Sequence, residues 1–146
     1  MNSDRVNAEY PHSELTGKVL RAAFTVSNSL GYGFLEKVYE NAIVVELTKI
    51  GLRARTQHPI GIRYKGVQVG DYVADLIVEE SVLVEIKATI EHHDVFVAQT
   101  INYLKATGLP VGLLLNFGKP RLRYRRFIAG KFDLELTEDA EQEESF

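Results

Sequence analysis

The stretch DYVADLIVEESVLVEIKA, residues 71–88, contains two apolar runs separated by the polar residues 79–81. Apolar, β-branched runs of this length on either side of a short polar segment predict two antiparallel strands joined by a tight turn. If the turn consists of the three residues 79–81, counting back along both strands places Asp75 directly opposite Glu85. A turn of two residues would instead put these acids on opposite faces of the sheet.

Charged side chains gather on one surface of this hairpin. Strand side chains alternate between faces, so Glu85 and Lys87 share one face of the second strand. Like charges directly opposed in a sheet are unfavourable by up to roughly 1 kcal/mol, so Asp75 and Glu85 need a positive charge between them. A divalent cation meets that need. Two acids and one amine in a small space are the composition of a metal-dependent phosphodiesterase site.

The length and composition limit the class of protein. The chain has 146 residues, of which 45% are hydrophobic, and we expect a single globular domain over residues 1–132. No apolar run is long enough to cross a bilayer, and residues 1–15 contain no hydrophobic segment of the secretory kind, so we expect a soluble, cytoplasmic protein with no membrane partner. The absence of cysteine excludes disulfides and thiolate metal sites, which leaves hard cations such as Mg²⁺ or Mn²⁺ as the default.

The net charge of −3 conceals an uneven distribution. Residues 1–132 contain all 17 basic residues and 13 of the 20 acids, which gives +4, whereas residues 133–146 carry −7. The acidic C-terminal tail, residues 133–146, has the composition of a solvated segment, and we interpret it as a solubility tail. The alternative is that it folds back over the basic surface and competes with a polyanion.

Hydrophobic periodicity outside the hairpin predicts the remaining elements. The fold class is α/β, a mixed central sheet flanked by helices. The expected order is two helices, three strands of antiparallel type, a third helix and two final strands, at residues 13–30, 34–50, 54–64, 67–78, 82–88, 94–107, 111–116 and 121–128.

Two of the predicted helices carry polar residues that can approach the hairpin acids. On the second helix, Glu36 and Tyr39 lie three residues apart and share a side. On the third helix, Gln99 and Tyr103 form a similar pair, and the strand that bears Lys87 leads almost directly into this helix. We therefore expect both helices to lie close to the hairpin acids.

Three segments of the chain together resemble a known family. The segment LGYGFLEKVYENAI (30–43) resembles the Gly-x-x-Glu-x-x-Tyr signature of the GxxExxY proteins, a branch of the PD-(D/E)XK nuclease superfamily. The segment YVADLIVEESVLVEIKA (72–88) is similar to the nuclease motif of that branch. The run AQTINYLKATGLPVGLLLNFG (98–118) resembles its glutamine-containing helix and following buried strand. The order of motifs agrees from about residue 15 to residue 128.

The resemblance implies a restriction-endonuclease-like fold and a metal-dependent nuclease that hydrolyses phosphodiester bonds. It implies that Asp75, Glu85 and Lys87 form the catalytic triad, with Glu36 and Gln99 as further site residues. Ala74 stands where some members have proline. Asp75, Glu85 and Glu36 would hold Mg²⁺ or Mn²⁺, and the backbone carbonyl of Ile86 is an additional candidate ligand, because hard cations accept backbone oxygens.

Lys87 has three alternative roles at this stage, which are to orient the attacking water, to deprotonate it, or to stabilise charge as a cation.

The densest basic segment follows the third helix and is the candidate nucleic-acid contact. It could instead be a solvated edge strand protected by charge. If it binds phosphates, binding falls steeply with salt. Its residues are Lys119, Arg121, Arg123, Arg125 and Arg126.

Nucleic acid is therefore the expected partner, with DNA favoured over RNA. Cleavage of both strands would need two sites, which makes a homodimer a reasonable expectation. The alternative function is a catalytically idle nucleic-acid-binding or protein-interaction module on the same fold.

Overall fold

The structure is a computed structural model of the chain, and it describes residues 12–91 and 94–130. The acidic tail predicted at residues 133–146 lies outside the described residues. The predicted order of helices and strands is confirmed, although the second helix and the last strand each begin two residues later than expected. The elements are α2 (Ser13–Leu30), α3 (Glu36–Lys49), β1 (Ala54–Tyr64), β2 (Val67–Val78), β3 (Val82–Lys87), α4 (Asp94–Thr107), β4 (Val111–Asn116) and β5 (Arg123–Ile128).

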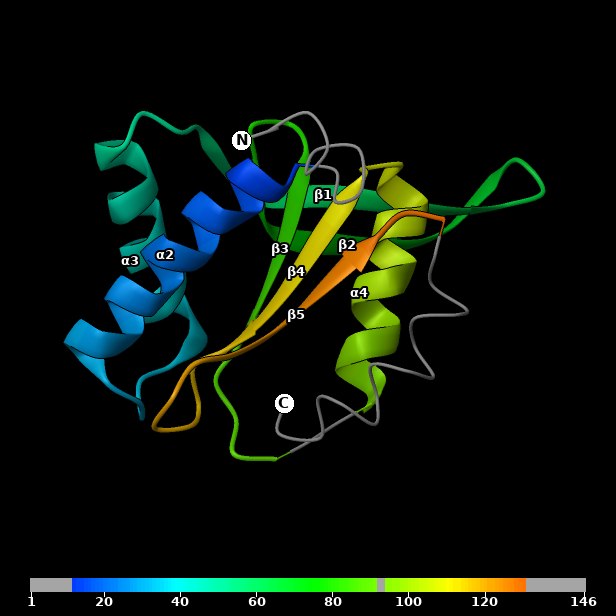
Figure 1. The fold of residues 1–146 in the computed structure, drawn as a ribbon. Coiled ribbons are helices and arrows are strands. Elements are labelled where there is room, and N and C mark those ends of the chain that lie inside the picture. Colours follow the sequence, from blue (N-terminus) through cyan, green and yellow to red (C-terminus); the bar gives the residue numbers. More distant parts are fainter. Residues whose placement is uncertain (1–11, 92–93, 131–146) are drawn as a thin grey trace.

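The strands form a five-stranded sheet in the order β1-β2-β3-β4-β5 (Figure 1). β3 and β4 are parallel, and α4 supplies the crossover connection that a parallel pair needs, whereas the other neighbouring pairs are antiparallel. The mixed sheet and the α/β class predicted from the sequence are therefore confirmed.

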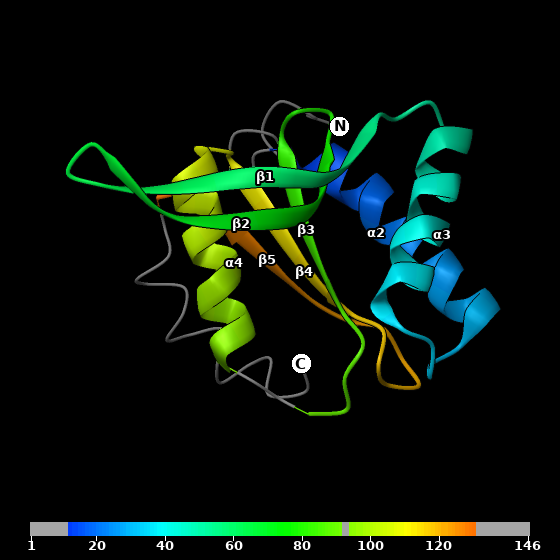
Figure 2. The ribbon, with the colours of Figure 1, turned by 180° about the vertical axis from the view of Figure 1, so that it is seen from behind.

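Helices cover both faces of the sheet, as Figures 1 and 2 show from opposite sides. α2 and α3 pack on one face against the apolar side chains of β2, β3 and β4 that include Leu76, Val84 and Leu113. α4 packs on the other face against the alternate positions, which include Leu83 and Leu114. Strand alternation thus divides one sheet into two buried layers, which explains why β3 and β4 read as continuous apolar runs.

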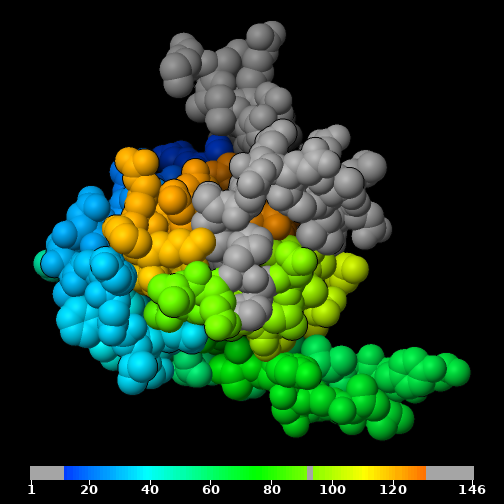
Figure 3. Space-filling model, turned by 90° about the horizontal axis from the view of Figure 1, so that it is seen from below, coloured from blue at the N-terminus to red at the C-terminus, as the bar shows by residue number. Residues whose placement is uncertain are grey.

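The outer part of the β1–β2 hairpin extends beyond the helices as a two-stranded arm (Figures 2 and 3). The two strands pair from Ala54↔Val78 to Tyr64↔Val67, so the far end of the arm pairs only within itself. Large apolar side chains are exposed along it, among them Tyr64, Val69 and Tyr72.

Among the helices of the described ranges, none has the length and apolar character needed to span a membrane.

Candidate functional site

β2 and β3 separate where the two hairpin acids face each other. The paired residues run from Val78↔Val82 to Leu76↔Val84, which is the register predicted from a three-residue turn, and one further step brings Asp75 opposite Glu85. From this point β2 continues along β1, while β3 continues along β4 to its last pair at Lys87. We call the opening between β2 and β3 at Asp75 and Glu85 the fork.

The two carboxylates replace the backbone ladder at the fork. The amide of Ile86 donates a hydrogen bond to Asp75 Oδ2 at 2.8 Å. The amide of Asp75 donates to Glu85 Oε1 at 3.2 Å. Each acid is therefore bonded to the strand that carries the other, beyond the point where the β2–β3 backbone pairing ends.

Burial makes the fork unfavourable for negative charge. Glu85 is 3% exposed, and burial raises its pKa to about 8, with the neighbouring Asp75 charge adding to the shift. Burial also raises the pKa of Asp75, although the hydrogen bond from Ile86 acts in the opposite direction. Two acids with raised pKa values in contact form a site that a cation would stabilise.

Glu36 approaches the fork from the first turn of α3. A cavity of 290 Å³ is lined by side chains of α3 and the first three strands, among them Glu36 and Asp75, and it also reaches Ile86. Partial burial raises the pKa of the Glu36 carboxyl, the Lys87 charge opposes this shift and the Asp75 charge reinforces it. Glu36 is therefore close enough to the fork for the charges of Asp75 and Lys87 to shift its pKa.

Two further polar residues line this cavity, and the sequence did not identify them as part of the site. Glu40 is 3% exposed and accepts hydrogen bonds from Lys37 Nζ at 2.5 Å and from Gln57 Nε2 at 2.6 Å. The side chain of Gln57 also hydrogen bonds Asp75, which lowers the pKa of that acid. Glu40 could have been identified in the sequence by its position one turn after Glu36, whereas no feature of the sequence pointed to Gln57.

Lys87 lies at the end of β3 and is held by α4. Its Nζ donates to Gln99 Oε1 at 3.2 Å and lies 4.6 Å from the centre of the Phe96 ring. Gln99 Nε2 in turn donates to the hydroxyl of Tyr103 at 2.9 Å. The predicted pair of Gln99 and Tyr103 therefore forms a chain of hydrogen bonds that fixes the position of the Lys87 ammonium group.

Asn116 fixes the backbone that follows Lys87. It is fully buried at the end of β4, and its Oδ1 accepts hydrogen bonds from the amides of Thr89 at 3.1 Å and Gly118 at 3.0 Å. Its Nδ2 donates to the carbonyl of Thr89 at 3.0 Å, and the amide of Phe117 donates to the carbonyl of Lys87 at 2.8 Å. A polar residue at the end of the apolar run VGLLLN was the available signal for this role.

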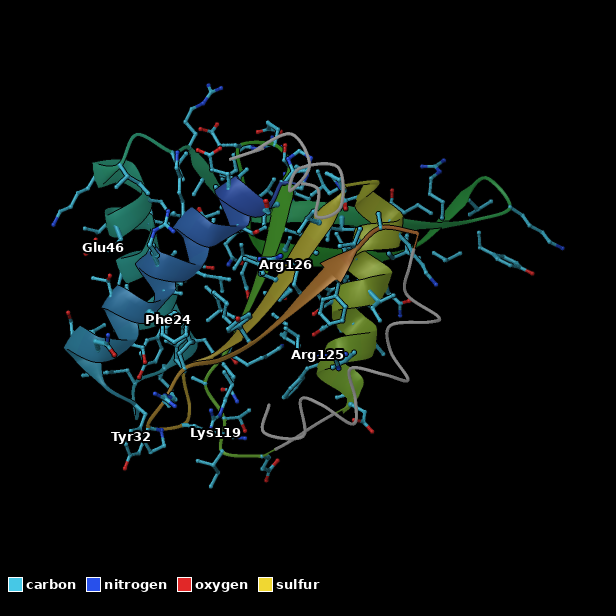
Figure 4. The ribbon with its side chains drawn as sticks, in the orientation of Figure 1. Phe24, Tyr32, Glu46, Lys119, Arg125 and Arg126 are labelled. Atoms are coloured by element: carbon cyan, nitrogen blue, oxygen red, sulfur yellow. The ribbon has the colours of Figure 1, made fainter. Side chains whose placement is uncertain are left out.

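The structure does not place the five basic residues on one surface. Arg125 pairs with Leu114 and faces α4, where it is only 5% exposed and lies 5.2 Å from the Phe127 ring. Arg126 occupies the next position along β5 and therefore projects from the opposite face (Figure 4). Arg123 shares the Arg125 face, and Lys119 and Arg121 lie in the segment before β5.

The donor set at the fork fits a hard divalent cation. The chain contains no cysteine, and the donors that converge are carboxylate oxygens with the backbone of Ile86 beside them. Within residues 12–91 and 94–130, no group of three or more His, Asp or Glu side chains is close enough to form a complete metal cage. The protein would therefore hold a cation through Asp75 and Glu85 first, with other ligands completing the shell.

Comparison with known proteins gives one family match. The sequence profile of the PD-(D/E)XK nuclease superfamily matches residues 13–127, which include all eight described elements except the final residue of β5. A solved structure described as "Crystal structure of SSO0001" is similar at 18% identity with a TM-score of 0.46, over 94% of this chain and 68% of that chain. No curated protein matches significantly. The mixed sheet with flanking helices agrees with the restriction-endonuclease-like fold implied by the motifs.

Proposed function

The chain belongs to the PD-(D/E)XK nuclease superfamily, and from this premise we propose that it hydrolyses phosphodiester bonds in nucleic acid with the aid of Mg²⁺ or Mn²⁺. The observation that carries the proposal is the fork, where Asp75 accepts a hydrogen bond from β3 and Glu85 accepts one from β2. Lys87 lies two residues after Glu85 on β3. In a structural ion pair, positive charge between the two acids would lower their pKa values. The pKa values of Asp75 and Glu85 are instead raised.

We propose that Asp75, Glu85 and the carbonyl of Ile86 hold the cation, with Glu36 approaching from α3. When bound, such a cation stabilises negative charge on the phosphate and favours ionisation of the attacking water. The contribution of the protein is to keep the donors in place, since Asp75 and Glu85 are each fixed by a backbone amide.

We assign Lys87 to the phosphate and Gln99 to the positioning of Lys87. Gln99 Oε1 accepts a hydrogen bond from the Lys87 Nζ, so Lys87 is oriented as a donor and its remaining N–H groups can contact an anionic oxygen or orient the water. Gln99 acts as a positioning residue, because its own amide nitrogen is bonded to Tyr103.

Membership of the GxxExxY branch is a finer proposal. Gly33 has a φ of 110°, a conformation that favours glycine, and it precedes the α3 helix that begins at Glu36. The Tyr39 hydroxyl donates to the carbonyl of Gly31 at 2.7 Å and accepts from the amide of Phe34 at 3.2 Å. The signature residues therefore act together to fix the segment that presents Glu36 to the fork.

The proposed substrate is DNA in preference to RNA. Phosphate contacts from Lys119, Arg121 and Arg123 would supplement the site. Arg126 projects from the opposite face of β5, and Arg125 would contact phosphate only after a local rearrangement because it is buried. A homodimer would be required only for cutting both strands of a duplex.

A cleavage assay tests the proposal. Labelled single-stranded, duplex and branched DNA, and matched RNA, are incubated with Mg²⁺, Mn²⁺ or EDTA. We expect cleavage that EDTA abolishes, and that Asp75→Ala, Glu85→Ala and Lys87→Ala each abolish while circular dichroism shows a retained fold. Asp71→Ala is the matched control, because Asp71 is an exposed acid on the same strand and accepts a hydrogen bond from Gln68.

Binding without cleavage of any substrate, unchanged by the three substitutions, would contradict this proposal. That outcome would favour a catalytically idle nucleic-acid-binding module on the same fold. Absence of both nucleic-acid and metal binding would leave a protein-interaction role.

A further inference from the structure

A groove of 890 Å³ opens between the β1–β2 arm and α4 and reaches Lys87. It lies on the α4 side of Lys87, whereas the cavity beside Glu36 lies against α3. One wall comes from the arm and the other from α4, which Figure 2 shows passing behind the hairpin. The lining residues that carry the argument are Arg63, Tyr72, Lys87, Phe96, Tyr103 and Lys105.

The charge of the groove complements a polyanion. Its lining includes the three cations Arg63, Lys87 and Lys105, and among residues 12–91 and 94–130 no acid lines it. Residues 1–132 carry a net charge of +4, and in the groove this positive charge is gathered on three side chains. Phosphates are favoured along such a surface, and the one cation that also belongs to the proposed active site is Lys87.

The groove also offers an aromatic surface. Tyr72 on the arm is 50% exposed, and its ring centroid lies 5.5 Å from that of Tyr103 on α4 with an interplanar angle of 46°. Tyr103 is buried and hydrogen bonded to Gln99, so the Tyr72 ring packs against a side chain whose position is fixed. An exposed ring on a rigid support, beside cations, is the arrangement on which unpaired bases stack.

We propose that this groove binds a single strand of DNA, with one base stacked on Tyr72 and the phosphates directed past Arg63 and Lys105 towards Lys87. The inference rests on the proposed nuclease function, and it assigns that function a single-stranded substrate. A base must leave the duplex to offer a face to Tyr72. The preference for deoxyribose is carried over from the proposed function, and comparison with oligo(U) tests it.

The absence of tryptophan from the chain allows a direct test. In Tyr72→Trp the only tryptophan stands at the proposed stacking position, so its fluorescence reports a stacked base. Tyr64→Trp is the matched control, because Tyr64 is an exposed tyrosine on the same arm, with 63% of its surface accessible, and does not line the groove. The protein is titrated with oligo(dT), oligo(U) and a DNA duplex of equal length in EDTA at low salt, so that no turnover occurs.

We expect oligo(dT) to quench the fluorescence of Tyr72→Trp in a saturable way and to leave that of Tyr64→Trp nearly unchanged. Replacement of the ring in Tyr72→Leu should weaken oligo(dT) binding roughly 5- to 150-fold by anisotropy. An absence of quenching in Tyr72→Trp, or equal quenching by the duplex, overturns the assignment of a single strand. Equal affinity for oligo(U) overturns the assignment of DNA.

The test separates this inference from the proposed function. Binding in EDTA does not depend on catalysis, so quenching together with a failure to cleave any substrate would contradict the nuclease proposal and leave the groove assignment intact. Metal-dependent cleavage that Tyr72→Leu leaves unaffected, with no quenching, would contradict the groove assignment alone.

Discussion

The amide of Asp75 donates a hydrogen bond to Glu85 Oε1, so a buried carboxylate on β3 is fixed by the strand that carries its partner acid. The reciprocal bond, from Ile86 to Asp75, fixes the second carboxylate in the same way. These bonds favour the charged forms, but burial outweighs them, since it raises the pKa of both acids. Backbone amides therefore hold both carboxylates before any cation binds, and a cation would stabilise their charged forms further.

The stability of the metal-free protein should therefore fall as the pH rises. Folded Glu85 keeps its proton up to a pKa of about 8, whereas the unfolded chain loses it near the ordinary value of 4.5. Between these values the unfolded state binds fewer protons, so each pH unit lowers the free energy of unfolding by on the order of 1 kcal/mol. Asp75 contributes with the same sign. Urea denaturation in EDTA at several pH values between 5 and 8 measures this slope.

Glu85→Gln removes the titrating group and should flatten that slope. Glu80→Gln, at the exposed turn of the same hairpin, is the control and should leave it unchanged. A slope that is equal in wild type and Glu85→Gln would show that burial of Glu85 does not govern the pH dependence.

Mg²⁺ or Mn²⁺ should stabilise the folded protein, and most strongly near pH 8. The cation binds the ionised carboxylates, so it compensates for the charge that burial disfavours. At a free metal concentration of about 100 times Kd, the expected gain in the free energy of unfolding is about 2.7 kcal/mol. Thermal denaturation with and without metal measures the gain. Asp75→Asn should abolish it, and an equal gain in wild type and this variant would place the cation elsewhere.

Gln99→Leu should lower kcat about 10-fold while changing KM little. The substitution removes the acceptor that orients the Lys87 Nζ, and a hydrogen bond to a charged group contributes about 1.5 kcal/mol. Steady-state cleavage kinetics measure the change. Gln68→Leu is the control, since Gln68 is exposed on the arm and bonded to Asp71. An increase in KM with unchanged kcat would indicate that Gln99 contacts the substrate directly and does not position Lys87.

The predicted elements were accurate where hydrophobic periodicity carried the information. The register at the fork followed from the turn length, because Val78 pairs with Val82. The segment with Arg123, Arg125 and Arg126 was harder to interpret, since a sequence of basic residues does not reveal that Arg125 is buried over Phe127. The alternation of side chains along a strand predicts the face of the sheet on which each residue lies. Whether the residue is buried depends on which helix covers that face.

Gln57 shows why part of the site could not be predicted. It has a φ of 52° within β1, between the paired residues Thr56 and His58, and its side chain reaches both Glu40 and Asp75. A glutamine has no intrinsic preference for this left-handed conformation, so nothing in the local sequence indicates it. Tertiary contacts with the two acids stabilise the conformation, and these contacts depend on the complete fold.

Tyr39→Phe should lower the free energy of unfolding by about 1 kcal/mol, because it removes the hydroxyl that joins Gly31 to Phe34. The ring remains stacked on Phe117 at a centroid distance of 4.6 Å, so the core should persist. Loss of the two bonds frees the segment before Glu36, and metal affinity measured by calorimetry should fall. Unchanged metal affinity would show that Glu36 is positioned by α3 alone, or that it is not a ligand.

Gly118→Ala should disturb the site through the backbone. A Cβ at this position would lie 2.2 Å from the amide nitrogen of Thr89, which neither segment can accommodate without moving. Overpacking of this kind costs about 1–3 kcal/mol, and the displacement reaches Lys87 through the hydrogen bonds of Asn116 and Phe117. Urea denaturation should show the lower free energy of unfolding, and cleavage assays should show the effect on the site. Gly17→Ala is the matched control, because its Cβ would meet only Arg21 at 3.6 Å in helix α2, and it should raise stability by about 0.5–1 kcal/mol. If Gly118→Ala retained full stability and cleavage, the close contact with Thr89 would not determine where Lys87 lies.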